Sequence, residues 1–531
     1  MRRRLAGMLF AVCLLLSLCG CGRRAVAGQG FRLPLSAEPV QLDPQVAADD
    51  ASVTVLSALM EGLTRLDEQG TAQPALATWT VSPDGCTYTF TLREAVWSNG
   101  DPVCADDFVF AITRLVLPDT RSALSSAAYG IAGAQAIREQ GADLSALGVR
   151  AVDANTLEIT LTQPDARFPE TLATSPFYPC PRAFFEQTGG RYGLEAAHLL
   201  SNGPFVLAGW THGESLLLNK NETYWDAASI APSRVRFLVA SYDDPVEALL
   251  SGEIDVYSLT ADQSAAAKQK IQIVELQDTV QCLWFNNEVT PLDTADVRRA
   301  LRGALEMESL RALLEETGQG VATGFLPPDT RLNGELYRTD TNALSFAPLG
   351  SGAQAAFQSG LAAAGQTEPL TLTLLCADDS DSVRLAQLIL QSWQKNLSIY
   401  WELQPLPAAD LAARVQVGNY QLALYSATGT SSSAWDSLAA FGSTATQGNL
   451  ARFHDVDFDA QLAALQSQSV TREEVEQLER YLWDQVPCVP LSDPVRTIGI
   501  APDITGLVVR PFGGSIYDFS LDFRAAMRPA A

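Results

Sequence analysis

The stretch EGLTRLDEQGTAQPALATWTVSPDGCTYTFTLREAVWSNGDPVCADDFVFAITRL, residues 61–115, decides the fold. Inside it, TYTFTL (residues 87–92) alternates tyrosine, phenylalanine and leucine with threonine, which predicts a strand with one buried face. The preceding PDG (residues 83–85) supplies a turn, so ATWTVS (residues 77–82) and TYTFTL are expected to form a hairpin. ADDFVFAITRL (residues 105–115) has apolar residues at helical spacing and two aspartates in its first turn, which predicts a helix.

Beyond about residue 280 the pattern of the chain changes. LTLTLLCADD (residues 370–379), IYWELQPL (residues 399–406) and YQLALYS (residues 420–426) have the composition of strands. Segments with helical spacing, residues 382–397 and 409–417, separate them. Strands and helices that alternate in this way indicate βαβ units and a mixed, largely parallel sheet. We therefore expect a first half rich in strands and a second half of α/β type.

The start of the chain has the pattern of an export signal. Arg2, Arg3 and Arg4 precede an uncharged apolar run over residues 5–18, which suits a signal-peptide core and is shorter than a membrane-spanning helix. The next residues, LCGC, resemble the lipobox of bacterial lipoproteins, in which Cys21 would receive the lipid. Several acyl chains on one residue give stable anchoring. We therefore predict a lipid-anchored protein on the extracytoplasmic face of a bacterial membrane, and the alternative is an ordinary cleaved signal with Cys21 incidental.

The composition is that of a globular protein with an acidic surface. The chain holds 36 Lys and Arg against 61 Asp and Glu, a formal net charge of −25, and 47% hydrophobic residues. Such a charge repels the phosphates of nucleic acids, so no nucleic-acid partner is expected, and solubility explains the acidity. After the leader, no segment reaches 18 uncharged apolar residues, so no further membrane span is expected.

The sequence contains none of the common motifs for catalysis. GxSxG, HExxH, Walker and GxGxxG patterns are all missing from it. Its three histidines lie far apart and the six cysteines after the leader show no CxxC spacing, so neither a metal nor a cofactor is expected. Paired aspartates such as Asp106 and Asp107 fit the start of a helix as well as they fit hydrolase chemistry. This profile suits a receptor for small molecules whose site lies between two lobes.

Five segments, read in order, resemble the extracellular solute-binding proteins of peptide- and nickel-type ABC importers, the family of the oligopeptide-binding proteins. They are EPVQLDPQ (residues 38–45), the stretch 61–115, SNGPFVLAGWTHGESLLLNKNETYWD (201–226), SGEIDV (251–256) and DVRRALRGALE (296–306). The resemblance implies an α/β fold, a two-lobed clamshell of the periplasmic-binding-protein type with mixed sheets. It also implies two crossing strands between the lobes and an extra subdomain inserted in the first lobe.

Within these segments, Asn99-Gly100 and Asn202-Gly203-Pro204 have the composition of turns. The resemblance implies a monomer without a cofactor. The chain is expected to divide into a signal peptide (residues 1–20), a lipidated tether (21–30), the first part of lobe I (31–63), the inserted subdomain (64–174), the rest of lobe I (175–278), lobe II (279–486) and a return to lobe I (487–531).

The resemblance also implies where a ligand binds. The cleft is expected between the EPVQLDP loop of one lobe and the loop after YQLALYS of the other. Peptide-binding members carry an aspartate in that second loop, which pairs with the α-ammonium of the peptide, but here the position falls at Gly429 or Thr430. Losing such a partner costs roughly 2–5 kcal/mol, and the nearest carboxylate is Asp436. The candidate ligand-binding residues are Glu38, Ser426, Thr428, Gly429, Thr430, Trp435 and Asp436.

Several functions stay open at this point. The first expectation is a solute-binding protein that delivers an oligopeptide to an ABC permease by hinge closure. Because the second loop offers hydroxyls and a tryptophan in place of a carboxylate, the second is an uncharged or amine-blocked ligand, such as an oligosaccharide. A surface-anchored hydrolase that uses some of the many carboxylates is a third alternative. A binding protein that acts only as a chaperone or sensor partner cannot be separated from these by sequence.

Cys86 and Cys104 are a separate question. The family usually has polar residues at these two positions, and the cysteines flank the hairpin and the helix of one predicted subdomain. They are the expected pair if the protein forms a disulfide, whereas two free thiols are the first expectation.

Overall fold

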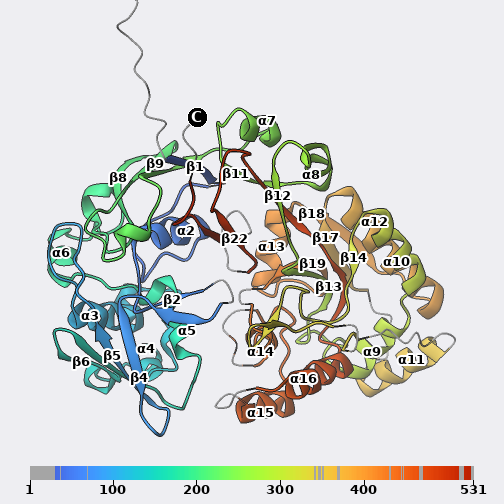
Figure 1. Ribbon diagram of the computed structural model, residues 1–531. Helices are drawn as coiled ribbons and strands as arrows, with labels where there is room; N and C mark the ends of the chain where they lie inside the picture. The colour runs from blue at the N-terminus through green and yellow to red at the C-terminus, as the bar shows by residue number, and fades with distance from the viewer. Residues whose placement is uncertain are drawn as a thin grey trace, which may run out of the picture.

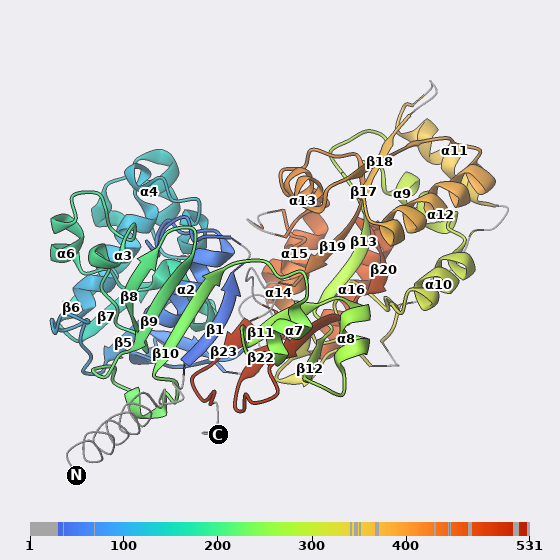
Figure 2. The ribbon, with the colours of Figure 1, turned by 90° about the horizontal axis from the view of Figure 1, so that it is seen from above.

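The computed structural model describes residues 30–35, 37–67, 70–339, 342–344, 349, 352–366, 371–429, 432–443, 445, 448–465, 470–512 and 520–527. They form two lobes, the blue and green one and the yellow and orange one of Figure 1, with strands running between them in the view of Figure 2. The predicted α/β architecture of two lobes with mixed sheets is therefore the one observed. Within the described residues, no helix is both long and apolar enough to cross a bilayer.

Lobe I is built on a four-stranded sheet. Its strands, in spatial order, are β1 (Gly30–Leu35), β10 (Arg234–Val239), β9 (Ser215–Lys220) and β8 (Phe205–Thr211). β1 runs parallel to β10, and the other neighbours are antiparallel. Helix α2 (Asp50–Leu59) packs against β8, and its buried side contributes to the core of this sheet. Val53 and Ser57, on the opposite side of α2, line the two cavities described below.

The quoted stretch folds into the hairpin and helix that its pattern predicts. β4 (Ala77–Val81) and β5 (Thr87–Leu92) pair as a hairpin, and α3 (Ala105–Val116) follows. They share a separate core with the other elements of this subdomain, because Tyr88, Phe90 and Phe108 are all buried in it. The other elements are β6 (Val149–Asp153), β7 (Thr156–Thr160), α4 (Ala134–Gln140), α5 (Phe168–Thr171) and the small hairpin of β2 (Thr64–Leu66) and β3 (Ala72–Pro74).

A three-stranded sheet at the base of lobe I combines segments from distant parts of the chain. Its order is β11 (Val256–Leu259), β21 (Arg496–Ile500) and β12 (Gln272–Leu276), with β21 in the middle and antiparallel to both neighbours. The C-terminal strands β22 (Val508–Arg510) and β23 (Ser520–Asp522) form a further pair. The remaining helices of this lobe are α6 (Arg182–Gln187), α7 (Pro245–Leu250) and α8 (Ala261–Ala267).

Lobe II is a mixed six-stranded sheet covered by helices on both faces. Its order is β14 (Gly320–Val321), β20 (Cys488–Asp493), β13 (Thr279–Phe285), β19 (Leu422–Thr428), β17 (Thr373–Ala377) and β18 (Glu402–Leu406). β17 runs parallel to β18 and β19, as the βαβ pattern predicts. The pairs β13–β19, β13–β20 and β14–β20 are antiparallel, so the sheet is mixed as expected but not largely parallel. A hydrophobic core lies on each face of the sheet.

The helices of lobe II are α9 (Ala295–Gly303), α10 (Met307–Glu316), α11 (Ala353–Ala363), α12 (Ser380–Leu397), α13 (Ala408–Gln416), α14 (Ala434–Ala439), α15 (Val456–Leu465) and α16 (Arg472–Gln485). Two of them, α12 and α13, separate β17, β18 and β19 as the predicted alternation requires, whereas other helices follow one another directly. A two-stranded hairpin, β15 (Arg331–Leu332) and β16 (Glu335–Leu336), completes the lobe.

Two chain crossings join the lobes, as expected. The first leads from β12 through Gln277 and Asp278 to β13, and the second leads from β20 through residues 494–495 to β21. The predicted return to lobe I at residue 487 falls one strand too early, because β20 still pairs with β13 in the sheet of lobe II. The sequence does not reveal this, since the apolar β20 and β21 look alike and only their pairing tells which lobe each belongs to.

The fold keeps Cys86 and Cys104 apart as free thiols. Cys86 precedes β5 and its carbonyl accepts from Leu161 N, whereas Ala105 N, next to Cys104, donates to Ala154 O beyond the other end of the β5–β7 ladder. The ladder between them is about five residues long, roughly 17 Å at the usual rise of a strand. A disulfide requires Cα atoms within about 7 Å, so the possible Cys86–Cys104 bond is not formed in this fold.

Candidate functional site

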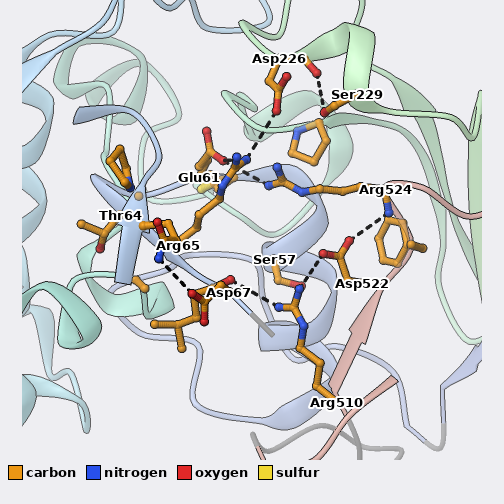
Figure 3. A pocket seen from close by; sticks show the side chains of 18 of the residues that line it. Ser57, Glu61, Thr64, Arg65, Asp67, Asp226, Ser229, Arg510, Asp522 and Arg524 are labelled. Carbon is orange, nitrogen blue, oxygen red and sulfur yellow. Dashed lines mark hydrogen bonds and ion pairs between the residues drawn. The ribbon is translucent and has the colours of Figure 1, made fainter. Parts of the chain in front are cut away.

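Two cavities lie along the outward side of α2. The larger has a volume of about 840 Å³ and is lined by the end of α2, the β2–β3 hairpin and the C-terminal strands of lobe I (Figure 3). The smaller, about 510 Å³, is lined from both lobes. Val53 lines the smaller cavity and Ser57, one helical turn further along α2, lines the larger one. Thr174 lines the smaller cavity and its neighbour Ala173 lines the larger one. The two cavities therefore adjoin.

The larger cavity is built around the buried carboxylate of Glu61. Its Oε1 accepts from Tyr224 Oη at 2.7 Å and from Arg524 Nη2 at 3.1 Å, and its Oε2 accepts from Trp225 Nε1 at 2.6 Å. Figure 3 shows the guanidinium groups of Arg65 and Arg524 beside it, both directed toward the carboxylate. Because a buried carboxylate with three strong donors is already satisfied, Glu61 is part of the wall and not a free ligand group.

Arg65 keeps hydrogen-bond donors available in this cavity, whereas Arg510 is engaged. The nearest carboxylate oxygens to Arg65 Nη1 lie at 3.5 Å on Asp226 and at 3.7 Å on Glu61, longer than a close ion pair. Arg510 donates from Nη2 to Asp522 Oδ2 at 2.8 Å and from Nη1 to Leu66 O at 3.5 Å, and its Nε is buried without a hydrogen-bond partner among the described residues. A guanidinium with unused donors can bind a carboxylate in a bidentate manner, so this cavity can hold the acidic end of a ligand.

The smaller cavity is lined by small and hydroxyl-bearing side chains and lies between the lobes. Lobe I supplies residues from the loop before α2, from residues 124–127 and from residues 171–176, and lobe II supplies Asp436, Ala439, Ala440 and Ala445. Asp436 is the only charged side chain among these lining residues. Alanines and hydroxyl groups leave room for a ligand and offer neutral hydrogen bonds, so this cavity suits an uncharged segment.

Asp436, the sequence candidate that does line the cleft, is already paired. Its Oδ1 accepts from Arg167 Nη1 of the inserted subdomain at 2.5 Å. Trp435, beside it, is 4% exposed and packs into a core of lobe II, with the Arg167 guanidinium 5.1 Å from its ring centre. Trp435 is not among the residues that line either cavity. Its buried ring contacts Arg167, so it is not positioned to stack on a sugar.

The other described candidates on lobe II are Ser426, Thr428 and Gly429, which line neither cavity. Ser426 and Thr428 belong to the last part of β19, where Thr428 Oγ1 lies 3.0 Å from Thr279 Oγ1 of β13. Gly429 N donates to Asp278 O at 3.0 Å. Thr430 lies outside the described residues. Gly429 is therefore hydrogen-bonded to the first chain crossing, whereas Asp436 and Ala439 of α14 line the smaller cavity.

Glu38 is held at the surface of lobe I. It accepts from Trp210 Nε1 at 2.9 Å and from Gly213 N at 3.0 Å, and its Oε1 lies 2.6 Å from His212 Nδ1. Burial raises the pKa of Glu38, but the hydrogen bonds from His212, Trp210 and Gly213 outweigh this effect and lower it overall. Glu38 lines neither of the two cavities.

Sequence reasoning missed Arg167 and the arginines of the larger cavity. Arg167 stands 269 residues from its partner Asp436, in a segment with no recognisable motif. Arg65 lies inside the quoted stretch, where its neighbours predict scaffold and nothing marks its side chain as exposed to a cavity. Among the described residues, no group of three or more His, Cys, Asp and Glu side chains is arranged to hold a metal ion.

Comparison with known proteins places these features in a family. Residues 71–449 match the family model described as bacterial extracellular solute-binding proteins, family 5. The periplasmic murein peptide-binding protein MppA of Escherichia coli is 31% identical over 498 residues, which cover 88% of each chain. The probable deoxycholate-binding periplasmic protein YgiS of Escherichia coli is 32% identical over 57% of this chain and 58% of its own length.

Solved structures have the same architecture. The substrate-binding domain of an oligopeptide ABC transporter from Bacillus anthracis superimposes with a TM-score of 0.75 and 26% identity, over 95% of this chain and 99% of that one. The two-lobed arrangement with mixed sheets is therefore that of a known type of solute-binding protein.

Proposed function

This chain belongs to family 5 of the bacterial extracellular solute-binding proteins, and from this membership we propose that it binds a peptide between its lobes and delivers it to the permease of an ABC importer. The observation that carries the proposal is the smaller cavity, because its wall comes from both lobes. A site shared by two lobes is completed when they close and dismantled when they open, which couples binding to release.

The two adjoining cavities indicate how a peptide would lie. The smaller cavity, with its alanine and hydroxyl lining, suits an extended uncharged segment held through its backbone groups, which are the same for every side chain. The larger cavity suits a terminal carboxylate, because Arg65 makes only long contacts with its own carboxylates and has donors to spare. An acidic end next to a neutral segment favours a peptide over an oligosaccharide.

A second candidate is a non-peptide or amine-blocked ligand in the same cleft. It is supported by the uncharged Gly429 and by the engagement of Asp436 with Arg167, which leave little to attract an α-ammonium group. A relative named as probably deoxycholate-binding indicates that ligands other than peptides occur in this family.

Titration calorimetry on the soluble protein without its leader tests the proposal. Tri- to pentapeptides are expected to bind with one-to-one stoichiometry and to raise the melting temperature. Matched N-acetylated peptides and oligosaccharides separate the two candidate ligands. A binding signal from oligosaccharides, with none from any peptide, would favour the non-peptide ligand. Turnover of peptide or sugar at catalytic protein concentration would support the hydrolase alternative and contradict both.

The proposed location is the extracytoplasmic face of the cell membrane, through a lipid on Cys21. Cys21 lies outside the described residues, and the support for it is the LCGC pattern after a signal-like run. We propose that the protein works there as a monomer that meets the permease from outside. In that arrangement the tether, residues 21–30, leads from the lipid to the first strand of lobe I.

A further inference from the structure

An ion pair spans the cleft between the inserted subdomain and lobe II. Arg167 precedes α5, Asp436 lies in the first turn of α14, and their Nη1 and Oδ1 atoms are 2.5 Å apart. The guanidinium also lies 5.1 Å from the ring centre of Trp435, within range of a cation–π contact. A second contact lies beside it, because a Cβ added to Gly70 would come within 2.4 Å of Ser432 Oγ.

Arg167 is surrounded by more than one carboxylate. Burial raises the pKa of Asp165 and of Glu170, and the charge of Asp436 raises both further, while Arg167 lowers both. Oε2 of Glu170 is buried without a hydrogen-bond partner among the described residues. The Arg167 guanidinium pairs with Asp436 and also acts electrostatically on Asp165 and Glu170, so its removal would take away the positive charge beside Asp436.

Asp436 is also the only charged side chain among the described residues that line the smaller cavity. A ligand ammonium that enters this cavity would have to displace the Arg167 guanidinium, which is held on two sides by Asp436 and Trp435. The protein therefore supplies from its own chain the positive charge that a peptide amine would bring.

We propose that Arg167 and Asp436 form a built-in clasp that favours lobe closure without a ligand charge and makes the cleft select ligands whose segment in the smaller cavity carries no ammonium group. Arg167 is then a specificity-determining residue that acts by occupying Asp436. The selectivity half of this proposal rests on the proposed function, whereas the closure half does not.

The closure half is tested by small-angle X-ray scattering on the ligand-free protein. Arg167→Ala and Asp436→Ala are each expected to enlarge the radius of gyration, with the ratio of closed to open molecules falling roughly two- to tenfold, since both partners are partly exposed. Arg150→Ala, which removes an ion pair inside the inserted subdomain, is the matched control and is expected to change nothing. Unchanged scattering for both clasp variants would overturn this half.

The selectivity half is tested by calorimetry with trialanine and N-acetyl-trialanine. The ratio of their Kd values is expected to shift by about tenfold toward the free amine in Arg167→Ala and to return to the wild-type ratio in Arg167→Ala/Asp436→Asn. A ratio that does not move in Arg167→Ala would overturn it, because a structural defect would weaken both ligands alike. If neither the wild type nor the variants bind either peptide, the proposed function fails. The scattering result alone then tests whether the Arg167–Asp436 pair favours closure.

Discussion

Asp278 and Arg496 form an ion pair that fastens together the two chain crossings between the lobes. Asp278 is fully buried between β12 and β13, and Arg496 opens β21 after the second crossing. Arg496 Nε donates to Oδ1 at 2.7 Å and Arg496 Nη2 contacts Oδ2, which also accepts from Phe512 N at 3.0 Å. The pair therefore links the two segments that connect the lobes.

Arg496→Ala is expected to lower the free energy of unfolding by roughly 3–5 kcal/mol, because it leaves the carboxylate of Asp278 buried without its charge partner. Urea denaturation followed by tryptophan fluorescence measures the change. Arg299→Ala removes an exposed ion pair of lobe II and is expected to cost less than about 1 kcal/mol. Equal effects of the two substitutions would show that the hinge pair contributes nothing special.

Asp493, at the end of β20, is expected to make stability depend on pH. Burial raises the pKa of Asp493 from its ordinary value of 3.8 to about 7, although Arg338 lowers it in part, and Oδ1 has no hydrogen-bond partner among the described residues. The folded protein therefore binds a proton more tightly than the unfolded chain. Its contribution is fully present below about pH 4 and is lost as the pH rises to about 7.

Asp493→Asn removes this titration without removing the side-chain volume. The variant is expected to lose the fall in stability between pH 4 and pH 7, which amounts to up to roughly 4 kcal/mol in the wild type. Thermal unfolding at a series of pH values measures it. Parallel curves for the two proteins across this range would contradict the assignment.

Much of the fold follows from local pattern alone. The alternation of residues 87–92 and the helical spacing of residues 105–115 determine β5 and α3, because period and turn chemistry act over a few residues. Ion pairs between residues far apart in the sequence cannot be predicted from local pattern. Asp43 of the EPVQLDP loop forms a buried ion pair with Arg114, and Glu61 accepts a hydrogen bond from Arg524, 463 residues away. No local signal pairs such residues.

The candidate site was predicted less well, for the same reason. The resemblance pointed to the loop after YQLALYS, and the cleft residue Asp436 was found there, but its guanidinium partner comes from another subdomain. The alanines that leave room for a ligand, such as Ala439 and Ala440, carry no chemical signal in a sequence. A cavity is a property of packing, and packing is decided by contacts that the sequence does not display.

Gly203→Ala is expected to destabilise the protein more than Gly100→Ala, although both glycines follow an asparagine in a predicted turn. A Cβ on Gly203 would lie 2.8 Å from the backbone of Leu59 and Met60, which cannot move without shifting α2. Gly100 has a φ of 92° but open space around it, so its cost is conformational, about 1–2 kcal/mol. Chemical denaturation of both variants measures the difference, and a larger cost at Gly100 would contradict this explanation.

Arg65→Gln is expected to weaken the binding of peptides with a free terminal carboxylate by roughly three- to tenfold and to leave C-terminally amidated peptides unaffected. The reason is that Arg65 contacts its own carboxylates only at 3.5 and 3.7 Å and has donors free for a ligand. Competition calorimetry with matched free and amidated peptides measures the ratio, with Arg384→Gln on the far lobe as the control. Equal weakening of both peptides would place the carboxylate elsewhere.

Cys21→Ala is expected to abolish attachment of fatty acid to the protein, whereas Cys19→Ala is expected to leave it intact. The two cysteines stand one residue apart in LCGC, but only Cys21 has a small residue, Gly20, before it, while Cys19 follows the bulky Leu18. Incorporation of labelled palmitate in cells producing each variant measures the modification directly. Cell fractionation follows its consequence, since a chain that loses the lipid and is cleaved as a secreted protein leaves the membrane. If Cys21→Ala still carries label, or if Cys19→Ala alone loses it, the proposed anchor residue is wrong; if none of the proteins carries label, the leader is an ordinary secretion signal.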